Sequence, residues 1–238
     1  MKRMIYPLLS AALCAAPALQ GCRFVQFDAS NITFASDNTA TETLKGSRTR
    51  ASRDFDLEPF KSLEINGACE LSFAQADTPS LTVEIGDNLL EHITVQQDGD
   101  RLVIGMDRHF KYNNATMEIT LASPTLEAVE FNGAAEVKFE EFKTPALSIE
   151  ANGASEMEFY ALQGGKVSLE LNGASEIDLR ALDCKSLRIQ ANGASEVTAS
   201  GRADEAKVNV AGTGDIDLSK LECPRKDAKV SGFGRVRK

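Results

Sequence analysis

The chain has 238 residues, of which 26 are Lys or Arg and 35 are Asp or Glu, so its formal charge is −9. This balance excludes a nucleic-acid-binding surface, because phosphate binding requires clustered Lys and Arg. Aromatic residues make up only 6% of the chain, which also excludes an aromatic platform for stacked bases. Hydrophobic residues make up 42%, which is enough to build a core.

The first segment, residues 1–21, has the pattern of a signal peptide. Two basic residues precede a mostly apolar run over 4–19, which is shorter than the roughly 20 apolar residues of a membrane-spanning helix. The run ends in Leu-Gln-Gly-Cys at 19–22, which resembles the lipobox of bacterial lipoproteins. We therefore expect cleavage before Cys22 and its acylation, so that membrane lipid holds the protein through buried acyl chains. The alternative is an ordinary signal peptide with a chance cysteine.

The next segment, residues 22–57, is expected to be the lipidated cysteine followed by a flexible polar tether. It is rich in Ser, Thr and Asn, and no period of 2 or 3.6 is sustained along it. A small basic cluster follows within it, which either touches lipid headgroups or is simply solvated: Lys45, Arg48, Arg50 and Arg53.

The folded domain, expected over 58–238, is dominated by an internal repeat centred on Asn-Gly. In the copy at 147–159, Leu147, Ile149 and Met157 alternate with polar residues, and a period of two indicates a strand. The central glycines recur at an almost constant interval: Gly133, Gly153, Gly173, Gly193, Gly212 and Gly232. A strand repeat of this length is typical of one coil of a β-solenoid. The predicted fold is therefore all-β, a right-handed, single-stranded parallel β-helix with coils of about 20 residues.

An irregular N-terminal cap is expected over 58–125, before the regular coils of 126–238. The first repeat copy, at Gly67, lies much farther from the second copy, at Gly133, than the later copies lie from one another. Between them lie further strand-like runs: 81–85, 92–96, 102–106 and 116–121. The turn at 98–100, Asp-Gly-Asp, predicts a hairpin that caps the stack.

Two polar rows follow from stacking the coils about 4.8 Å apart. The first is a structural ladder of asparagines that hydrogen-bond from coil to coil, with a polar ligand-binding stripe as the alternative: Asn66, Asn132, Asn152, Asn172 and Asn192. The second is a row of glutamates: Glu70, Glu136, Glu156, Glu176 and Glu196. This row is interpreted either as a solvated face that keeps the sheet soluble or as a face for a ligand or a cation such as Ca²⁺.

Five cysteines are present, of which Cys14 lies in the signal segment and Cys22 is the predicted lipid attachment point. Cys69 occupies the repeat position that Ala or Ser fills elsewhere, so Cys69 and Cys184 are interpreted as small core residues. A disulfide between Cys184 and Cys223 stays open, and the spacing indicates no zinc site. We expect no metal and no cofactor.

These motifs carry a family resemblance. The segments Phe-Lys-Ser-Leu-Glu-Ile-Asn-Gly-Ala (60–68), Asp-Asn-Leu-Leu-Glu-His-Ile (87–93) and Gly-Asp-Arg-Leu-Val-Ile (99–104) resemble the putative auto-transporter adhesin, head GIN domain family. This is a domain of unknown function found in Bacteroidetes lipoproteins. The resemblance covers roughly 54–238 and implies a β-helical fold and an envelope or surface location. It implies no catalytic residues.

The function expected from the sequence is that of a non-enzymatic envelope lipoprotein of the outer membrane, facing the periplasm or the cell surface. Its partner would be a glycan, an envelope or surface protein, or another copy of itself. A carbohydrate-active β-helix enzyme and a self-associating structural protein are the alternatives. Three observations argue against an enzyme. The carboxylates recur with the repeat, and the chain has no Trp on which a sugar could stack. His92, in a strand-like run, and His109 have no evident Ser or Cys nucleophile to act with.

Overall fold

The structure is a computed structural model that describes residues 25–28, 31–34 and 42–238. The predicted signal peptide and Cys22 lie outside the described residues. The chain divides into two compact units, one made of residues 1–44 with 108–112 and the other of 45–107 with 113–238. The described residues are almost entirely β, which confirms the predicted class.

The first unit holds short paired strands. β1 (Val25–Asp28) and β2 (Asn31–Phe34) form a two-stranded antiparallel sheet. β3 (Glu42–Lys45) and β9 (Phe110–Asn113) form another two-stranded sheet.

The second unit contains the repeat and one short 3₁₀-helix, η1 (Asp87–His92). Its strands are β4 (Arg50–Phe55), β5 (Ser62–Gln75), β6 (Ser80–Gly86), β7 (Ile93–Asp98), β8 (Arg101–Met106), β10 (Met117–Ser123), β11 (Ala128–Phe139), β12 (Phe142–Phe159), β13 (Leu162–Gly212), β14 (Asp215–Glu222), β15 (Arg225–Gly232) and β16 (Arg235–Arg237).

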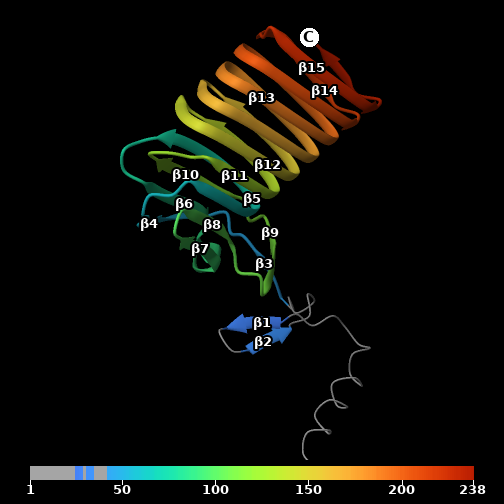
Figure 1. Ribbon diagram of the computed structural model, residues 1–238. Coiled ribbons are helices and arrows are strands. Elements are labelled where there is room, and N and C mark those ends of the chain that lie inside the picture. The colour runs from blue at the N-terminus through green and yellow to red at the C-terminus, as the bar shows by residue number, and fades with distance from the viewer. Residues whose placement is uncertain (1–24, 29–30, 35–41) are drawn as a thin grey trace, which may run out of the picture. The chain divides into compact units, whose positions relative to one another are not determined.

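The repeat copies pair in parallel and in register. Asn132 of β11 pairs with Asn152 of β12, and Asn152 pairs with Asn172 of β13, so each pairing advances the chain by one whole copy. β11 pairs in the same way with β5, so that Asn66 and Asn132 are partners. β5, β11, β12 and β13 therefore lie side by side in that order, and β14 and β15 follow (Figure 1).

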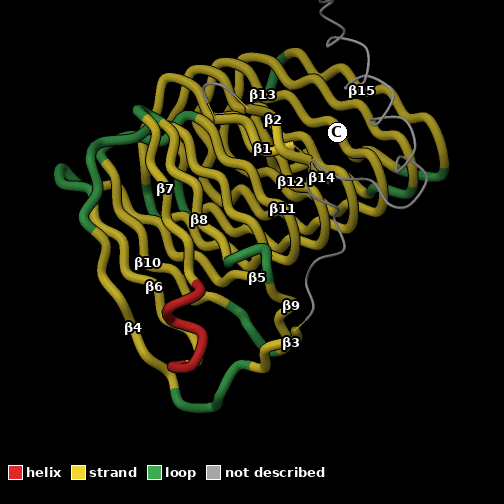
Figure 2. Tube along the Cα trace, turned by 90° about the horizontal axis from the view of Figure 1, so that it is seen from below, coloured by secondary structure: helices red, strands yellow, loops and turns green. Residues whose placement is uncertain are grey.

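The N-terminal part of this sheet is mixed. β5 pairs in parallel with β8 and β10, whereas β6 pairs antiparallel with β10 and β4, and β7 pairs antiparallel with β8. The predicted hairpin is β7–β8, in which Asp98 pairs with Arg101 and Gly99 has a φ of 54°. η1 lies at the end of the sheet that holds β4 and β6 (Figure 2). His92 is the last residue of η1 and not part of a strand, which corrects the prediction for that residue.

The core consists of the inward-facing side chains of successive strands. Leu147, Ile149 and Met157 are buried and their polar neighbours face outward, as the period of two predicts. Four phenylalanines meet where β5, β11 and β12 lie next to one another, and the rings of Phe139 and Phe159 stack with centroids 4.4 Å apart. This continuous column of apolar contacts holds the stacked strands together.

The predicted tether requires a correction, because a paired strand of the main sheet lies within 22–57. β4 pairs antiparallel with β6, with Ala51 opposite Ile85 and Phe55 opposite Leu81. The backbone pairing holds β4 in place although only Ala51 and Phe55 are half-buried. An edge strand with one exposed face and charged side chains has the composition of a linker, and the sequence pattern did not distinguish the two.

No helix in the described ranges has the length and apolar character needed to cross a membrane.

Candidate functional site

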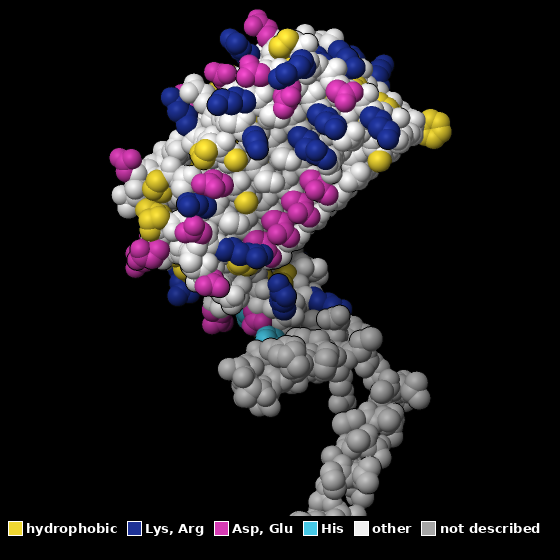
Figure 3. Space-filling model, viewed as in Figure 1, with side chains coloured by type: hydrophobic (Ala, Val, Ile, Leu, Met, Phe, Trp, Pro, Cys, Tyr) yellow, Lys and Arg dark blue, Asp and Glu magenta, His cyan; other side chains and the backbone are white. Residues whose placement is uncertain are grey.

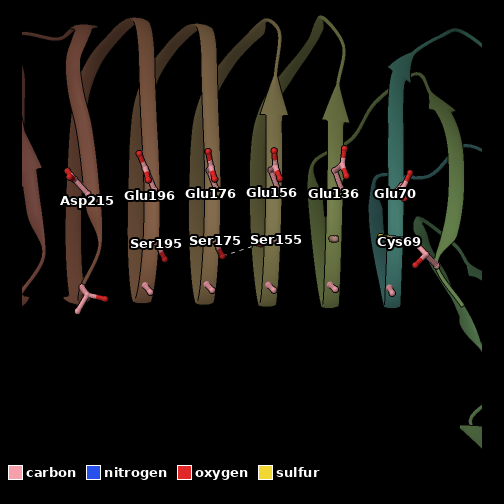
Figure 4. A pocket seen from close by; sticks show the side chains of 18 residues that line it. Cys69, Glu70, Glu136, Ser155, Glu156, Ser175, Glu176, Ser195, Glu196 and Asp215 are labelled. Atoms are coloured by element: carbon pink, nitrogen blue, oxygen red, sulfur yellow. Dashed lines mark hydrogen bonds between the residues drawn. The ribbon is translucent and has the colours of Figure 1, made fainter. Parts of the chain in front are cut away.

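A shallow groove of about 700 Å³ runs across the stacked strands (Figure 4). It lies just after the Asn-Gly pair of each repeat copy, and this pair is called the corner below. Its wall consists of three neighbouring positions of the repeat, each contributed by several strands. The first is an alanine, the second is small, and the third is acidic: Ala68, Ala134, Ala154, Ala174 and Ala194; Cys69, Ala135, Ser155, Ser175 and Ser195; Glu70, Glu136, Glu156, Glu176, Glu196 and Asp215. Thr116 and Thr213 complete the lining at the two ends.

The corner that shapes the groove depends on glycine. Gly153 has a φ of 142° and Gly173 a φ of 149°, a region that favours glycine. A Cβ on Gly173 would lie 2.1 Å from the carbonyl oxygen of Gly153 in the preceding copy. Glycine is therefore required both by the backbone angle and by the close approach of consecutive copies.

The asparagines before these glycines form hydrogen bonds along the stack. The Asn132 Nδ2 donates to Asn66 Oδ1 at 3.2 Å, and the same bond joins Asn152 to Asn132 (3.1 Å), Asn172 to Asn152 (3.1 Å) and Asn192 to Asn172 (3.0 Å). In the first three copies, Nδ2 also donates to the glutamate two residues before it, as from Asn152 to Glu150 at 3.0 Å. Most of the amide groups are thus already bonded within the chain.

The serines lie between the alanines and the glutamates, and their side chains are almost completely buried. The Ser155 Oγ donates to Ser175 Oγ at 3.1 Å, while Ser195, which is 3% exposed, has no hydrogen-bond partner for its Oγ in the described part of the chain. Cys69 takes this position in β5. Burial, and to a smaller extent the neighbouring Glu70 carboxylate, raises the pKa of the Cys69 thiol to about 12.

The glutamates are the exposed wall of the groove. The parallel register places Glu70, Glu136, Glu156 and Glu176 in consecutive strands, about one strand spacing apart. A line of acidic side chains crosses the stacked strands in the space-filling view (Figure 3). The Lys138 Nζ lies 3.1 Å from Glu136 Oε1, but Lys138 itself is outside the groove lining.

One member of the acidic row was not predicted. Asp215 is the register partner of Glu196 and continues the row into β14. The copy that contains Asp215 is degenerate, with Asp in place of the repeated Glu, and the register shift between β13 and β14 lies beyond it, between Thr198 and Ser200. Hydrogen bonding from Arg235 lowers the pKa of the Asp215 carboxyl, and its Oδ2 lies 2.7 Å from Arg235 Nη2. The alanine and serine rows were also not predicted to line a site, although the repeat contained that signal.

The chemistry available in the groove is that of carboxylates, hydroxyls and small apolar groups. Within the described residues, no three His, Cys, Asp or Glu side chains are grouped so that they could hold a metal ion. Among the residues that the structure describes, the groove lining includes no His, Lys, Arg or Tyr. This arrangement can make the same polar and apolar contacts once per strand.

The remaining cysteines are not joined in the structure. Cys69 and Cys184 are buried free thiols, and Cys223 is a half-buried free thiol whose Sγ donates to the Arg225 carbonyl oxygen at 3.2 Å. Burial is the main cause that raises the pKa of Cys184 to about 12. The disulfide left open by the sequence is therefore absent between Cys184 and Cys223 here.

Comparison with known proteins identifies the family. The model of a family described as "putative auto-transporter adhesin, head GIN domain" matches residues 59–237. A search of curated proteins gave no match.

Several solved structures have the same fold. A putative adhesin from Bacteroides fragilis is 20% identical, covers 82% of this chain and 99% of its own, and has a TM-score of 0.66. A putative adhesin from Parabacteroides distasonis is 19% identical, with coverage of 82% and 84% and a TM-score of 0.72. A putative lipid binding protein from the same organism is 19% identical, with coverage of 83% and 99% and a TM-score of 0.68.

Proposed function

Since the chain belongs to the putative auto-transporter adhesin, head GIN domain family, we propose that it is a non-enzymatic, adhesion-type binding protein of the bacterial cell envelope. The family and the names of its structural relatives suggest this class and an envelope or surface location. The observation that carries the proposal is the groove, whose alanine, small and acidic positions are repeated from strand to strand.

The fold proposed for the repeat is a right-handed, single-stranded parallel β-solenoid. The in-register parallel pairing of whole repeat copies from β11 to β13 supports it. Such a stack is stiff, because each strand pairs along its whole length with the next. A stiff support holds the groove open in a fixed shape, which lowers the entropic cost of binding an extended ligand.

Attachment to the membrane is proposed to occur through acylated Cys22. The Leu-Gln-Gly-Cys motif at 19–22 supports this assignment. The protein would then be an outer-membrane lipoprotein that presents its groove to the periplasm or to the cell surface. Metabolic labelling with a palmitate analogue tests the anchor, since the label should be lost in Cys22→Ser.

The ligand proposed for the groove is an extended chain that contacts several repeat copies at once, such as a glycan or a segment of an envelope protein. The regular spacing of the glutamates supports a repeating ligand, because equal contacts recur once per strand. Hydroxyls of a glycan or cationic groups of a peptide can donate hydrogen bonds to these carboxylates. One structural relative has a name that indicates lipid binding, so lipid vesicles belong in the same test.

The experiment is a binding screen of the full chain against a glycan array, envelope extracts and lipid vesicles, followed by a double substitution. Glu156→Gln with Glu176→Gln should weaken binding at least about tenfold, because it removes two neighbouring acceptor charges from the groove. Glu141→Gln, exposed and outside the groove, is the matched control. Equal loss in the control, or turnover of a polysaccharide by the wild type, would contradict the proposal.

Calorimetry with CaCl₂ tests the interpretation of the glutamate row as a cation site, and the absence of heat at millimolar calcium would exclude that interpretation.

A further inference from the structure

The last strands of the stack leave one edge of the sheet open. In the described part of the chain, β15 pairs with β13 alone and β16 pairs with β14 alone. The inward-facing residues Ala228 and Val230 lie in register above the buried Val208 and Val210. Val230 is nevertheless 40% exposed, because no further strand of the described residues covers it. Unpaired backbone groups beside partly exposed apolar side chains form a surface suited to strand addition.

The outward face of β15 carries two oppositely charged side chains that form no ion pair in the described chain. Asp227 and Lys229 are exposed and make no ion pair among the described residues. Phe233, directly after β15, is 95% exposed. An aromatic ring this exposed, next to an unpaired strand edge, is characteristic of a contact surface.

We propose that this end of the stack binds a second copy of the chain, with the two β15 strands paired antiparallel about a two-fold axis at Ala228. Asp227 then faces the partner's Lys229, and by symmetry Lys229 faces the partner's Asp227. Arg225 faces the partner's Ser231, so no like charges are opposed along the strand. The two sheets become one continuous sheet across the interface.

The sequence of β15 selects this register over its neighbours. A one-residue slip would place inward-facing residues opposite outward-facing ones, because side chains alternate between the two faces. Centring the pair on Asp227 would oppose two carboxylates, and centring it on Lys229 would oppose two ammonium groups. Of the registers centred on Asp227, Ala228 and Lys229, the one centred on Ala228 places opposite charges across from each other.

The apolar contacts fit the same register. Ala228 meets its own symmetry mate, and Val230 faces the partner's Lys226. Lys226 is half-buried and its Nζ donates to the Leu218 carbonyl oxygen at 2.8 Å, so its aliphatic stem lies across the open end of the coil. Phe233 comes level with the partner's Cys223 and Pro224, which would cover the exposed ring. This inference is independent of the ligand proposed for the groove.

The test is a set of charge reversals in the full chain, held in a non-ionic detergent and analysed by sedimentation velocity. We expect a dimer for the wild type and about tenfold to hundredfold weaker association for Lys229→Asp or Asp227→Lys, since each reversal replaces two attractive pairs with two repulsive ones. The double variant Asp227→Lys with Lys229→Asp should associate as the wild type does. Lys166→Asp, at an exposed position of β13 without an ion pair in the described chain, is the control.

A second variant tests the apolar part of the interface. Phe233→Ser should weaken the dimer about tenfold and leave the melting temperature of the monomer unchanged, because the ring makes few contacts within its own chain. Far-UV circular dichroism checks that every variant is folded. A monomeric wild type at high micromolar concentration, single reversals that dimerise normally, or a double variant that stays monomeric would each overturn the proposal. Binding of a monomeric wild type to anionic vesicles, lost in Lys229→Asp, would instead assign the surface to lipid and also overturn it.

Discussion

At the residue scale, each glycine of the corner is required for two separate reasons, its backbone angle and its contact with the neighbouring copy. Gly133, Gly153, Gly173 and Gly193 all have φ near 142–149°. Each also lies where a Cβ would meet the backbone of the glycine before it. The asparagine ladder beside them depends on this close approach, because amide side chains can bond from copy to copy only when the backbones stack at strand spacing.

The first prediction concerns Gly173. Gly173→Ala should lower the free energy of unfolding by at least about 2 kcal/mol, because it combines an unfavourable φ with a backbone collision. The midpoint of urea unfolding measures the effect. Gly99→Asn is the control, since Gly99 has a φ of 54°, where Asn is tolerated, and a Cβ at this position would have nothing within 4 Å. Similar losses for both variants would show that the stacked backbones do not constrain the site.

The second prediction concerns Cys69 and pH. Its ordinary pKa is 9.0, and burial raises it to about 12 in the folded chain. Above pH 9.0 the unfolded thiol ionises while the folded one stays protonated, so the unfolded state binds fewer protons and stability falls as the pH rises towards 12. Below pH 9.0 this contribution is fully present.

Cys69→Ala isolates this contribution, because Ala135 occupies the same position in the next strand. The free energy of unfolding of the wild type should fall more steeply than that of the variant as the pH rises from 9.0 towards 12. Urea titrations at several pH values provide the measurement. Parallel curves for the two proteins would contradict the assignment.

At the element scale, β4 shows how pairing can order a segment of polar composition. Arg50 contributes to this pairing by contacting two carboxylates, with Nε 2.7 Å from Glu84 Oε1 and Nη2 3.2 Å from Glu118 Oε2. The three residues lie on β4, β6 and β10, which are neighbours in the sheet. Their charges therefore link three strands that are distant in sequence.

The third prediction tests that link. Arg50→Glu should destabilise the edge by about 1 kcal/mol, because it places three carboxylates together on a partly exposed surface. Hydrogen exchange should become faster in β4 and β6 and stay unchanged in β12. Arg48→Glu, exposed and without an ion pair in the described chain, is the control. Equal exchange in β6 for the two variants would contradict a role for Arg50.

At the scale of the second unit, the cost of losing a side chain should depend on its place in the stack. Val210 and Val230 are register partners in consecutive copies, yet Val210 is 2% exposed and Val230 is 40% exposed. Val210 is covered by strands on both sides, whereas Val230 is covered on one side only in the described chain. The same residue type in the same column thus has two environments.

The fourth prediction uses this pair. Val210→Ala should cost about 2 kcal/mol through lost burial and a residual cavity, and Val230→Ala should cost less than about 1 kcal/mol. Chemical unfolding at concentrations low enough for a monomer measures both. A larger loss for Val230 than for Val210 would show that the open end is covered within the monomer.

Much of the repeat could be predicted from the sequence because its signals are local. The alternation at 147–159 identified which side chains are buried, and the spacing of the Asn-Gly pairs identified which residues share a row. The family was also recognised from its motifs. Asp215 was missed because its copy is degenerate and has Asp where the other copies have Glu, so the repeated motif did not include it.

The sequence by itself determined the strand period, the side of each strand that faces inward and the residues that recur in register. These depend on hydrophobicity and backbone geometry within one copy, and the copies are nearly alike. Only the tertiary structure decided how β4, β6, β7 and β8 pair, that the small residues after the corner form a groove, and that β15 is paired on one side only among the described residues. Those features arise from contacts between residues far apart in the chain, whose pairing no local periodicity specifies.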